Sequence, residues 1–214
     1  MASYSIVVAR YNEDIAWLKP LMDHCVIYNK GPALGLKNEI SLPNVGRESH
    51  TYLYHIIQNY DSLTDIVVFT QARISDHRGS NDPNYLLKMR DEAEKAGKSV
   101  PPEIHTDGRG LAYCWNSSFN LDKRCYLSIF GNPSCYKEKR IVPFKTWFEN
   151  HITTPYPNPI SIYPNALFAV TKKHILSRPK SYYESLIQQC DYAIKPTEAH
   201  FFERSWYYIF DGSQ

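Results

Sequence analysis

The densest group of reactive side chains in this 214-residue sequence lies between Arg73 and Arg78. A carboxylate, Asp76, and an imidazole, His77, stand between these two arginines. Donors of this kind can bind a divalent cation, and guanidinium groups can bind a phosphate. The segment therefore predicts a site for a metal ion and a phosphate. The alternative is an exposed turn in which Asp76 only caps and pairs with Arg78, since exposed charges are usually just solvated.

A second candidate group lies near the C-terminus, where Glu203 and Arg204 follow His200 at intervals of three and four residues. At this spacing the three side chains share one face of a helix. In the functional interpretation, His200 is a metal ligand and Glu203 is a carboxylate beside the reacting atoms. In the alternative, Glu203 and Arg204 form a structural ion pair and His200 is a surface histidine.

A third candidate is the segment Gly46–His50, which opens a predicted helix. Free N–H groups at a helix start attract anions, and Arg47 could hold one there. The alternative is a simple helix start with Glu48 in its first turn. Other motifs are missing from the sequence. Residues 108–110 lack the lysine and hydroxyl residue of a P-loop, no G-x-S-x-G is present, and no G-x-G-x-x-G follows the first strand.

The elements that must position these groups alternate along the first third of the chain. Apolar segments predict buried strands over 5–9, 26–28 and 66–69, and helical spacing predicts helices around 15–21 and over 48–60. Pro20 should kink or end the first of these helices. This order predicts a parallel sheet with helices on both faces and a ligand site at the carboxyl ends of the strands.

The rest of the chain predicts less regular structure. Residues 103–145 form an irregular stretch rich in aromatic residues. Around it we expect helices over 86–96, 145–150, 182–190 and 197–210, a helical turn over 172–178, and strands over 160–162 and 167–170.

Composition limits the classes of function. With 43% hydrophobic residues and a length of 214, one domain is expected. No apolar run approaches the roughly 20 residues of a membrane span. A net charge of +2 argues against a nucleic-acid partner. The 5 cysteines are scattered without a C-x-x-C pair, and the start of the chain lacks the features of a signal peptide. We therefore expect a soluble, cytoplasmic protein with buried free thiols.

The opening segment, Ser5–Asp14, resembles the first strand and loop of GT-A glycosyltransferases, in which this loop receives the base and ribose of the nucleotide. Further segments extend the likeness over nearly the whole chain. Together they are similar to the DUF3431 group, a glycosyltransferase-like family of fungi, bacteria and large DNA viruses. Within it, the chain resembles the N-terminal glycosyltransferase domain of a chlorovirus protein that takes part in capsid glycan synthesis. The further segments are Asn44–Tyr54, Val67–Gln71, Ala166–Val170 with Arg178-Pro179, and Phe201–Trp206.

The resemblance implies a GT-A-like, Rossmann-like α/β fold with a mixed, mostly parallel central sheet flanked by helices. A single domain would span residues 1–214, with about 1–80 binding the nucleotide and about 103–214 binding the acceptor. Enzymes of this type bind Mn²⁺ or Mg²⁺ through an Asp-x-Asp motif, often helped by a late histidine. The Asp-x-Asp motif is missing here, which puts the metal in doubt.

By the same resemblance, each candidate residue takes a role. Asp76 would be the metal ligand, with His77 in reserve and His200 as the late histidine, and Arg73 and Arg78 would otherwise neutralise the diphosphate. Arg10, Tyr11 and Asn12 would hold uridine or another base, and Lys30, Arg47 and Gln71 would reach ribose or phosphate.

We therefore expect a glycosyltransferase that moves a hexosyl or 6-deoxyhexosyl group, with rhamnosyl as one candidate, from a UDP-sugar to a glycan acceptor in viral capsid glycan synthesis. Glu203, as base or stabiliser, and Asp76 are the expected catalytic residues, and the family favours retention. One alternative is a non-catalytic nucleotide- or glycan-binding module of the same fold, which the missing motif favours. Another is a metal-dependent phosphohydrolase built on Asp76, His77 and His200.

Overall fold

The computed structural model describes residues 2–96, 144–153, 155–156 and 163–210. Its centre is a five-stranded sheet in the order β3-β2-β1-β4-β5. Strands β1 to β4 are parallel, and β5 is antiparallel to β4. The predicted mixed, mostly parallel α/β fold is confirmed at this level. The strands are β1 Tyr4–Arg10, β2 Cys25–Asn29, β3 Glu39–Ser41, β4 Ile66–Gln71 and β5 Phe168–Thr171.

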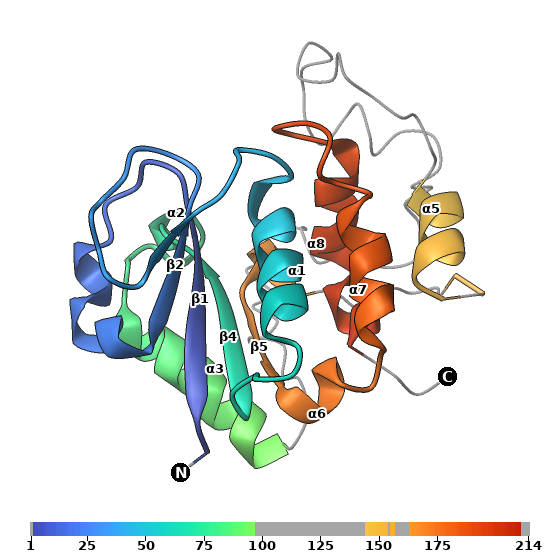
Figure 1. Cartoon of the computed structure of the whole chain (residues 1–214). Helices are drawn as coiled ribbons and strands as arrows, with labels where there is room; N and C mark the ends of the chain where they lie inside the picture. Colours follow the sequence, from blue (N-terminus) through green and yellow to red (C-terminus); the bar gives the residue numbers. More distant parts are fainter. Residues whose placement is uncertain (1, 97–143, 154, 157–162, 211–214) are drawn as a thin grey trace.

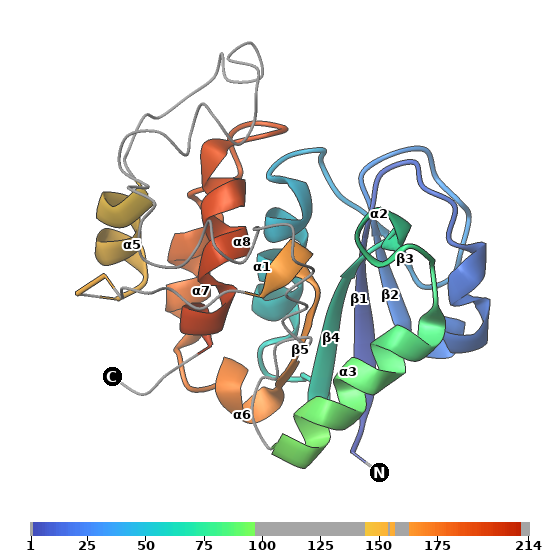
Figure 2. The same cartoon turned by 180° about the vertical axis from the view of Figure 1, so that it is seen from behind.

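Helices cover both faces of the sheet and enclose two cores (Figures 1 and 2). Alternate residues of a strand point to opposite faces, so Val7 enters the first core and its neighbours Ile6 and Val8 enter the second. Both faces of β1 are therefore apolar, which explains why its sequence is an unbroken apolar run. The first core includes residues of α1 Arg47–Asn59, α5 Phe144–His151, α7 Lys180–Ile187 and α8 Thr197–Ile209, and the second includes residues of η1 Ala16–His24 and α3 Pro83–Ala96.

The remaining elements are short. They are α2 Ser75–Arg78, η3 Pro164–Ala166 and α6 Lys172–Ile175. Within the described ranges, no helix has the length and apolar character needed to cross a membrane. Cys25 and Cys190 are buried and free, as expected, whereas the other cysteines lie outside the described residues.

Several elements differ from the sequence predictions, among them the short helices α2 and η3, which are not predicted. The segment expected to be an α-helix around residues 15–21 is a 3-10 helix, η1, with Pro20 inside it. Pro20 is expected to kink or end this helix, but η1 continues past it to His24. Strand β3 is not predicted, because its three residues are partly exposed and form no apolar run. The strand expected over 160–162 lies outside the described residues.

The strand order reverses at β1, because the chain runs from β1 to β2 and β3 on one side and then crosses to β4 on the other. In open α/β sheets the ligand site lies at the carboxyl ends of the strands at such a point. Helix α1 follows β3, so its N-terminus lies at this same edge, which is uppermost in Figure 1. The fold thus places the loops after β1, β2 and β4 and the start of α1 around one edge.

Candidate functional site

Four charged or titratable side chains from two helices meet beside this edge. Arg47 opens α1, and its Nη1 lies 3.3 Å from Nε2 of His200 on α8. Across the imidazole ring, Nδ1 of His200 lies 3.9 Å from a carboxylate oxygen of Glu203. The same oxygen is 3.7 Å from Nη1 of Arg204. We call these four residues the Arg47–His200 cluster; its α8 members share one helical face, as their spacing predicts.

The protonation states in the cluster follow from burial and from neighbouring charges. Burial alone would raise the pKa of Glu203, but His200, Arg204 and Arg47 outweigh it and lower that pKa to about 2. Burial lowers the pKa of His200; Glu203 opposes this shift and Arg47 reinforces it. At neutral pH an ionised carboxylate therefore faces a neutral imidazole. This state fits the contact with Arg47, since a neutral ring protonated at Nδ1 leaves Nε2 as an acceptor.

The backbone that carries Arg47 is strained. Gly46 and Arg47 both adopt positive φ, 64° and 50°. Glycine takes this conformation freely, whereas for arginine it is unfavourable. Gly46 also has no room for a side chain, because a Cβ there would lie 2.5 Å from the carbonyl oxygen of Cys190 and 2.6 Å from Cβ of His50. Its N–H donates to the carbonyl of Ala193 at 2.8 Å, so the segment after α7 fixes this turn.

Lys30, the first residue after β2, contacts the backbone of the same turn. Its Nζ donates to the carbonyl oxygen of Val45 at 2.5 Å and to that of Arg47. Burial lowers the pKa of Lys30 to about 8, although Cys190 and Glu48 act in the opposite direction. The ammonium group of Lys30 therefore binds carbonyl groups of the protein itself. The resemblance had implied that it would reach the ribose or phosphate of a nucleotide.

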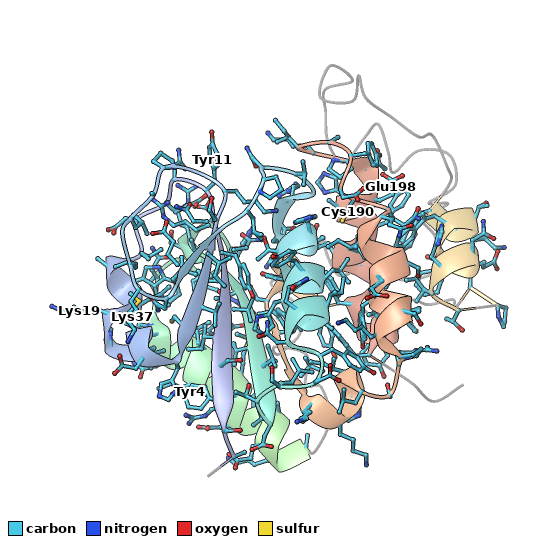
Figure 3. The ribbon with its side chains drawn as sticks, in the orientation of Figure 1. Tyr4, Tyr11, Lys19, Lys37, Cys190 and Glu198 are labelled. Carbon is cyan, nitrogen blue, oxygen red and sulfur yellow. The ribbon has the colours of Figure 1, made fainter. Side chains whose placement is uncertain are left out.

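Hydrogen bonds fix the loops after β1 and β2. Arg10 is 8% exposed and donates to Oδ1 of Asn29 at 2.8 Å and to backbone carbonyls of both loops. A carboxylate oxygen of Glu13 accepts the N–H groups of Tyr11 at 2.8 Å and of Asn12 at 3.1 Å. The Tyr11 side chain remains 48% exposed at the upper edge in Figure 3. An exposed ring on a fixed loop can stack on a flat ligand such as a base.

The end of β4 joins a second strained turn. Nε2 of Gln71 donates to the carbonyl oxygen of Asn165 at 3.2 Å. Asn165 and Ala166 have positive φ of 62° and 53°. The carbonyl of Ala166 accepts a 3.1 Å hydrogen bond from the hydroxyl of Tyr52, which lies on α1. Helix α1 therefore connects two turns of the kind in which backbone strain accompanies function.

The segment Arg73–Arg78 forms α2 and the turn before it, beyond the end of β4. Nε of Arg73 donates to Asp76 at 3.0 Å, and both side chains are 56% exposed. The guanidinium of Arg78 lies 4.3 Å from the ring centre of Tyr85. His77 is exposed. The alternative interpretation of this segment predicts an exposed Asp76 paired with Arg78; Asp76 is exposed, but its partner is Arg73, and Arg78 contacts Tyr85 instead.

The candidate metal ligands lie on different elements. Asp76 and His77 belong to α2, which follows Ile74 of the second core, whereas His200 belongs to α8 at the first core. Among the described residues, no group of three or more His, Cys, Asp or Glu side chains could hold a metal ion. Asp76, His77 and His200 thus form no such group with one another, and the bound divalent cation stays an expectation from the resemblance.

The burial of two polar side chains near the cluster, His50 and Glu198, is not predicted from the sequence. His50 is 6% exposed, and burial, reinforced by Lys30, lowers its pKa to about 4. Glu198 is 1% exposed and accepts a 2.5 Å hydrogen bond from the hydroxyl of Tyr192. In the sequence both residues resemble solvated residues in the first turn of a helix. The segment between α7 and α8, which carries Cys190 (Figure 3), packs against the start of α1. This packing removes the start of α1 from solvent.

The Arg47–His200 cluster can bind an anion and stabilise a cation at the same place. The Arg47 side chain is 37% exposed and the Glu203 side chain 29%, so both are accessible to a ligand from solvent. A guanidinium group suits a phosphate or diphosphate. An ionised carboxylate held by fixed partners can stabilise positive charge that develops on a reacting carbon. These are the two charges that separate when a sugar leaves a nucleoside diphosphate.

A family model described as "Protein of unknown function (DUF3431)" matches residues 6–214 of the chain. Neither the curated proteins nor the solved structures include a match. The Arg47–His200 cluster and the loop after β1, which carries Tyr11, Asn12 and Glu13, both lie inside the range that the family model covers.

Proposed function

The chain belongs to the DUF3431 family, and we propose that it is a GT-A-type glycosyltransferase that transfers a hexosyl or 6-deoxyhexosyl group from a UDP-sugar to a glycan acceptor. The observation that carries this proposal is the meeting of Arg47 and an ionised Glu203 at the carboxyl-end edge of a mostly parallel sheet. Nucleotides bind at this edge in open α/β sheets. The likeness to a chlorovirus domain makes a capsid glycan the proposed acceptor class and the cytoplasm the proposed location.

The nucleotide would lie across the point between β1 and β4 where the strand order reverses. The exposed Tyr11 ring offers a stacking surface for uracil, on a loop that Glu13 and Arg10 hold in place. The Arg47 guanidinium offers its charge to the diphosphate. Its Nε lies 3.5 Å from a carboxylate oxygen of Glu48 and its Nη1 lies 3.3 Å from His200, so a diphosphate would have to share the guanidinium with these two groups. Gln71 ends β4, the strand beside β1 at this point.

In the transfer, the bond between the anomeric carbon and the β-phosphate oxygen breaks, and its electron pair leaves with UDP. Positive charge then develops on the sugar ring, which Glu203 stabilises, and negative charge develops on the diphosphate, which Arg47 stabilises. The acceptor hydroxyl oxygen forms the new bond to the anomeric carbon. In the retaining course that we favour, this hydroxyl approaches from the side that UDP leaves and gives its proton to the departing diphosphate.

Isothermal titration calorimetry with UDP, UDP-sugars and GDP tests the donor site. We expect micromolar binding of UDP, about −8 kcal/mol, and weaker binding of GDP. The variant Arg47→Met should weaken UDP binding about tenfold or more, because a charge-assisted contact is lost. Arg90→Met is the matched control, since Arg90 stacks on Tyr4 near the opposite ends of the strands.

Transfer itself is tested by mass spectrometry of UDP-hexoses and UDP-6-deoxyhexoses incubated with glycan acceptors, and the anomeric proton coupling of the product gives the stereochemistry. Absence of nucleotide binding by the folded protein would overturn the proposal. Binding without transfer would indicate a binding module, and sugar release to water without an acceptor would indicate a hydrolase. Each titration is repeated with Mn²⁺ and with EDTA, because stronger binding in Mn²⁺ would show that a divalent cation takes part in donor binding.

A further inference from the structure

We infer that Lys30 is a positioning residue for Arg47. Its ammonium group holds the left-handed turn at Gly46 and Arg47, and this keeps the Arg47 guanidinium at the anion-binding position. The inference rests on the proposed function for its ligand, UDP, but not for its structural basis. Lys30 lies at the end of β2 and Arg47 at the start of α1, so one side chain connects the sheet edge to the helix start.

The geometry of the turn shows why such a contact is needed. Arg47 has a φ of 50°, which a non-glycine residue adopts only when its surroundings enforce it. The N-cap residue of α1 is Gly46, which has no side chain that could accept a hydrogen bond from the first turn of the helix. The two carbonyl groups that Lys30 contacts, those of Val45 and Arg47, flank Gly46 on both sides. A cation on both carbonyls favours the conformation in which they point the same way.

The groups that face Lys30 leave it as a cation at neutral pH. Glu48 and His50 face it from α1, and Cys190 faces it from the segment after α7. His50 is neutral because burial lowers its pKa to about 4, and burial raises the pKa of Cys190, so its thiol stays protonated. Burial also lowers the pKa of Lys30 to about 8. The ammonium therefore loses its proton within the pH range of an ordinary binding assay, and a neutral amine is a weaker donor to carbonyl oxygens.

The first test compares UDP dissociation constants between pH 7 and 9 for the wild type, Lys30→Met and the control Lys37→Met, whose lysine is exposed (Figure 3). At pH 7, Lys30→Met should bind UDP about tenfold more weakly than the wild type, and the ratio should fall towards one as the pH passes 8. Ionisation of uracil affects all variants equally and cancels in the ratio. Lys30→Arg should retain its binding at pH 9. A ratio near one at pH 7 would overturn the inference.

A double-mutant cycle tests whether Lys30 acts through Arg47. If it does, the double variant Lys30→Met/Arg47→Met should bind UDP within about twofold of Arg47→Met alone. If Lys30 contacts the nucleotide itself, the two losses should multiply, and that result would also overturn the inference.

A third test needs no ligand. The ¹⁵N chemical shifts of the His200 ring, assigned with His200→Gln, report the contact between Arg47 and Nε2. Lys30→Met and Arg47→Met should both change the Nε2 shift, and Lys37→Met should not. An unchanged shift in folded Lys30→Met would overturn the inference whether or not UDP binds. Conversely, a wild type that does not bind UDP would overturn the proposed function, while the NMR result would still decide the role of Lys30.

Discussion

Glu203 is kept ionised by its neighbours on α8 and by Arg47, and this determines what its replacement should do. The variant Glu203→Gln keeps the size of the side chain and removes the charge that would stabilise the departing sugar. We expect the transfer rate to fall by about 10²–10³, a loss typical of one preorganised electrostatic contact. The dissociation constant of UDP should change less than about threefold. Steady-state kinetics and calorimetry measure both, and an equal loss in binding and in rate would contradict a catalytic role.

The same residue makes the fold sensitive to acid. The folded-state pKa of Glu203, about 2, lies below its ordinary value of 4.5, and the pKa of His200 is also lowered. The unfolded chain therefore binds more protons at acid pH, and stability present at pH 7 is lost as the pH falls, first through the range of His200 and then from about 4.5 towards 2. Urea unfolding at pH 7, 5 and 3 should show that Glu203→Gln loses less stability than the wild type between pH 5 and 3. Parallel losses would contradict this assignment.

Lys30 predicts a further rise in stability at alkaline pH. Its folded-state pKa of about 8 lies below the ordinary 10.5, so the unfolded chain binds the proton more tightly between these values. The free energy of unfolding should therefore rise with pH from about 8 to 10.5 through this group. Urea unfolding of the wild type and Lys30→Met, from pH 7 to 9.5, should show the wild type gaining relative to the variant. A constant difference would show that Lys30 titrates normally.

The start of α1 depends on a glycine for two separate reasons, and two substitutions separate them. Gly46→Ala introduces a methyl group at positive φ and against the carbonyl of Cys190. Gly35→Ala is the matched control, because Gly35 has a φ of 72° but a Cβ there would meet no heavy atom within 4 Å. We expect the control to lose about 1 kcal/mol and Gly46→Ala to lose about 2–4 kcal/mol in urea unfolding. Similar losses would mean that the turn can move away from Cys190.

The strands of the sheet could be predicted from the sequence where burial on both faces requires a continuous run of apolar residues. Strands β1 and β4 are apolar on both faces, so each appears as a continuous run. Strand β3 could not be predicted in this way, since its three residues are partly exposed and form no apolar run. For η1, the apolar spacing was informative but the winding depends on Pro20.

The candidate site was predictable only within one element at a time. The common face of His200, Glu203 and Arg204 follows from helical spacing. That Arg47 joins them depends on packing between residues 153 positions apart, for which the sequence contains no local signal. For Asp76, sequence reasoning allowed a metal site or an ion pair, and only the structure shows its contact with Arg73.

The proposed site depends on segments far apart in the sequence, because the donor would contact the loop after β1, the start of α1 and helix α8. A ligand that binds only the folded chain stabilises it, by about 2.7 kcal/mol at 100 times its dissociation constant. For a chain of this size we expect UDP at that concentration to raise the Tm by roughly 5–10 °C, and GDP to raise it less. Differential scanning fluorimetry measures this shift. Arg47→Met should reduce the shift at the same UDP concentration, and a full shift in that variant would separate Arg47 from the nucleotide site.

The antiparallel strand β5 has a consequence for synthesis of the protein. This strand and α8 come from the last fifty or so residues, yet β5 pairs with β4 and α8 supplies the partners of Arg47. While the chain emerges from the ribosome, the parallel strands can associate first, but the first core stays uncovered until α8 has left the exit tunnel. Binding competence is thus acquired only after α8 has been synthesised, so products of synthesis interrupted before that point carry the loop after β1 and Arg47 without the carboxylate that would act on the sugar.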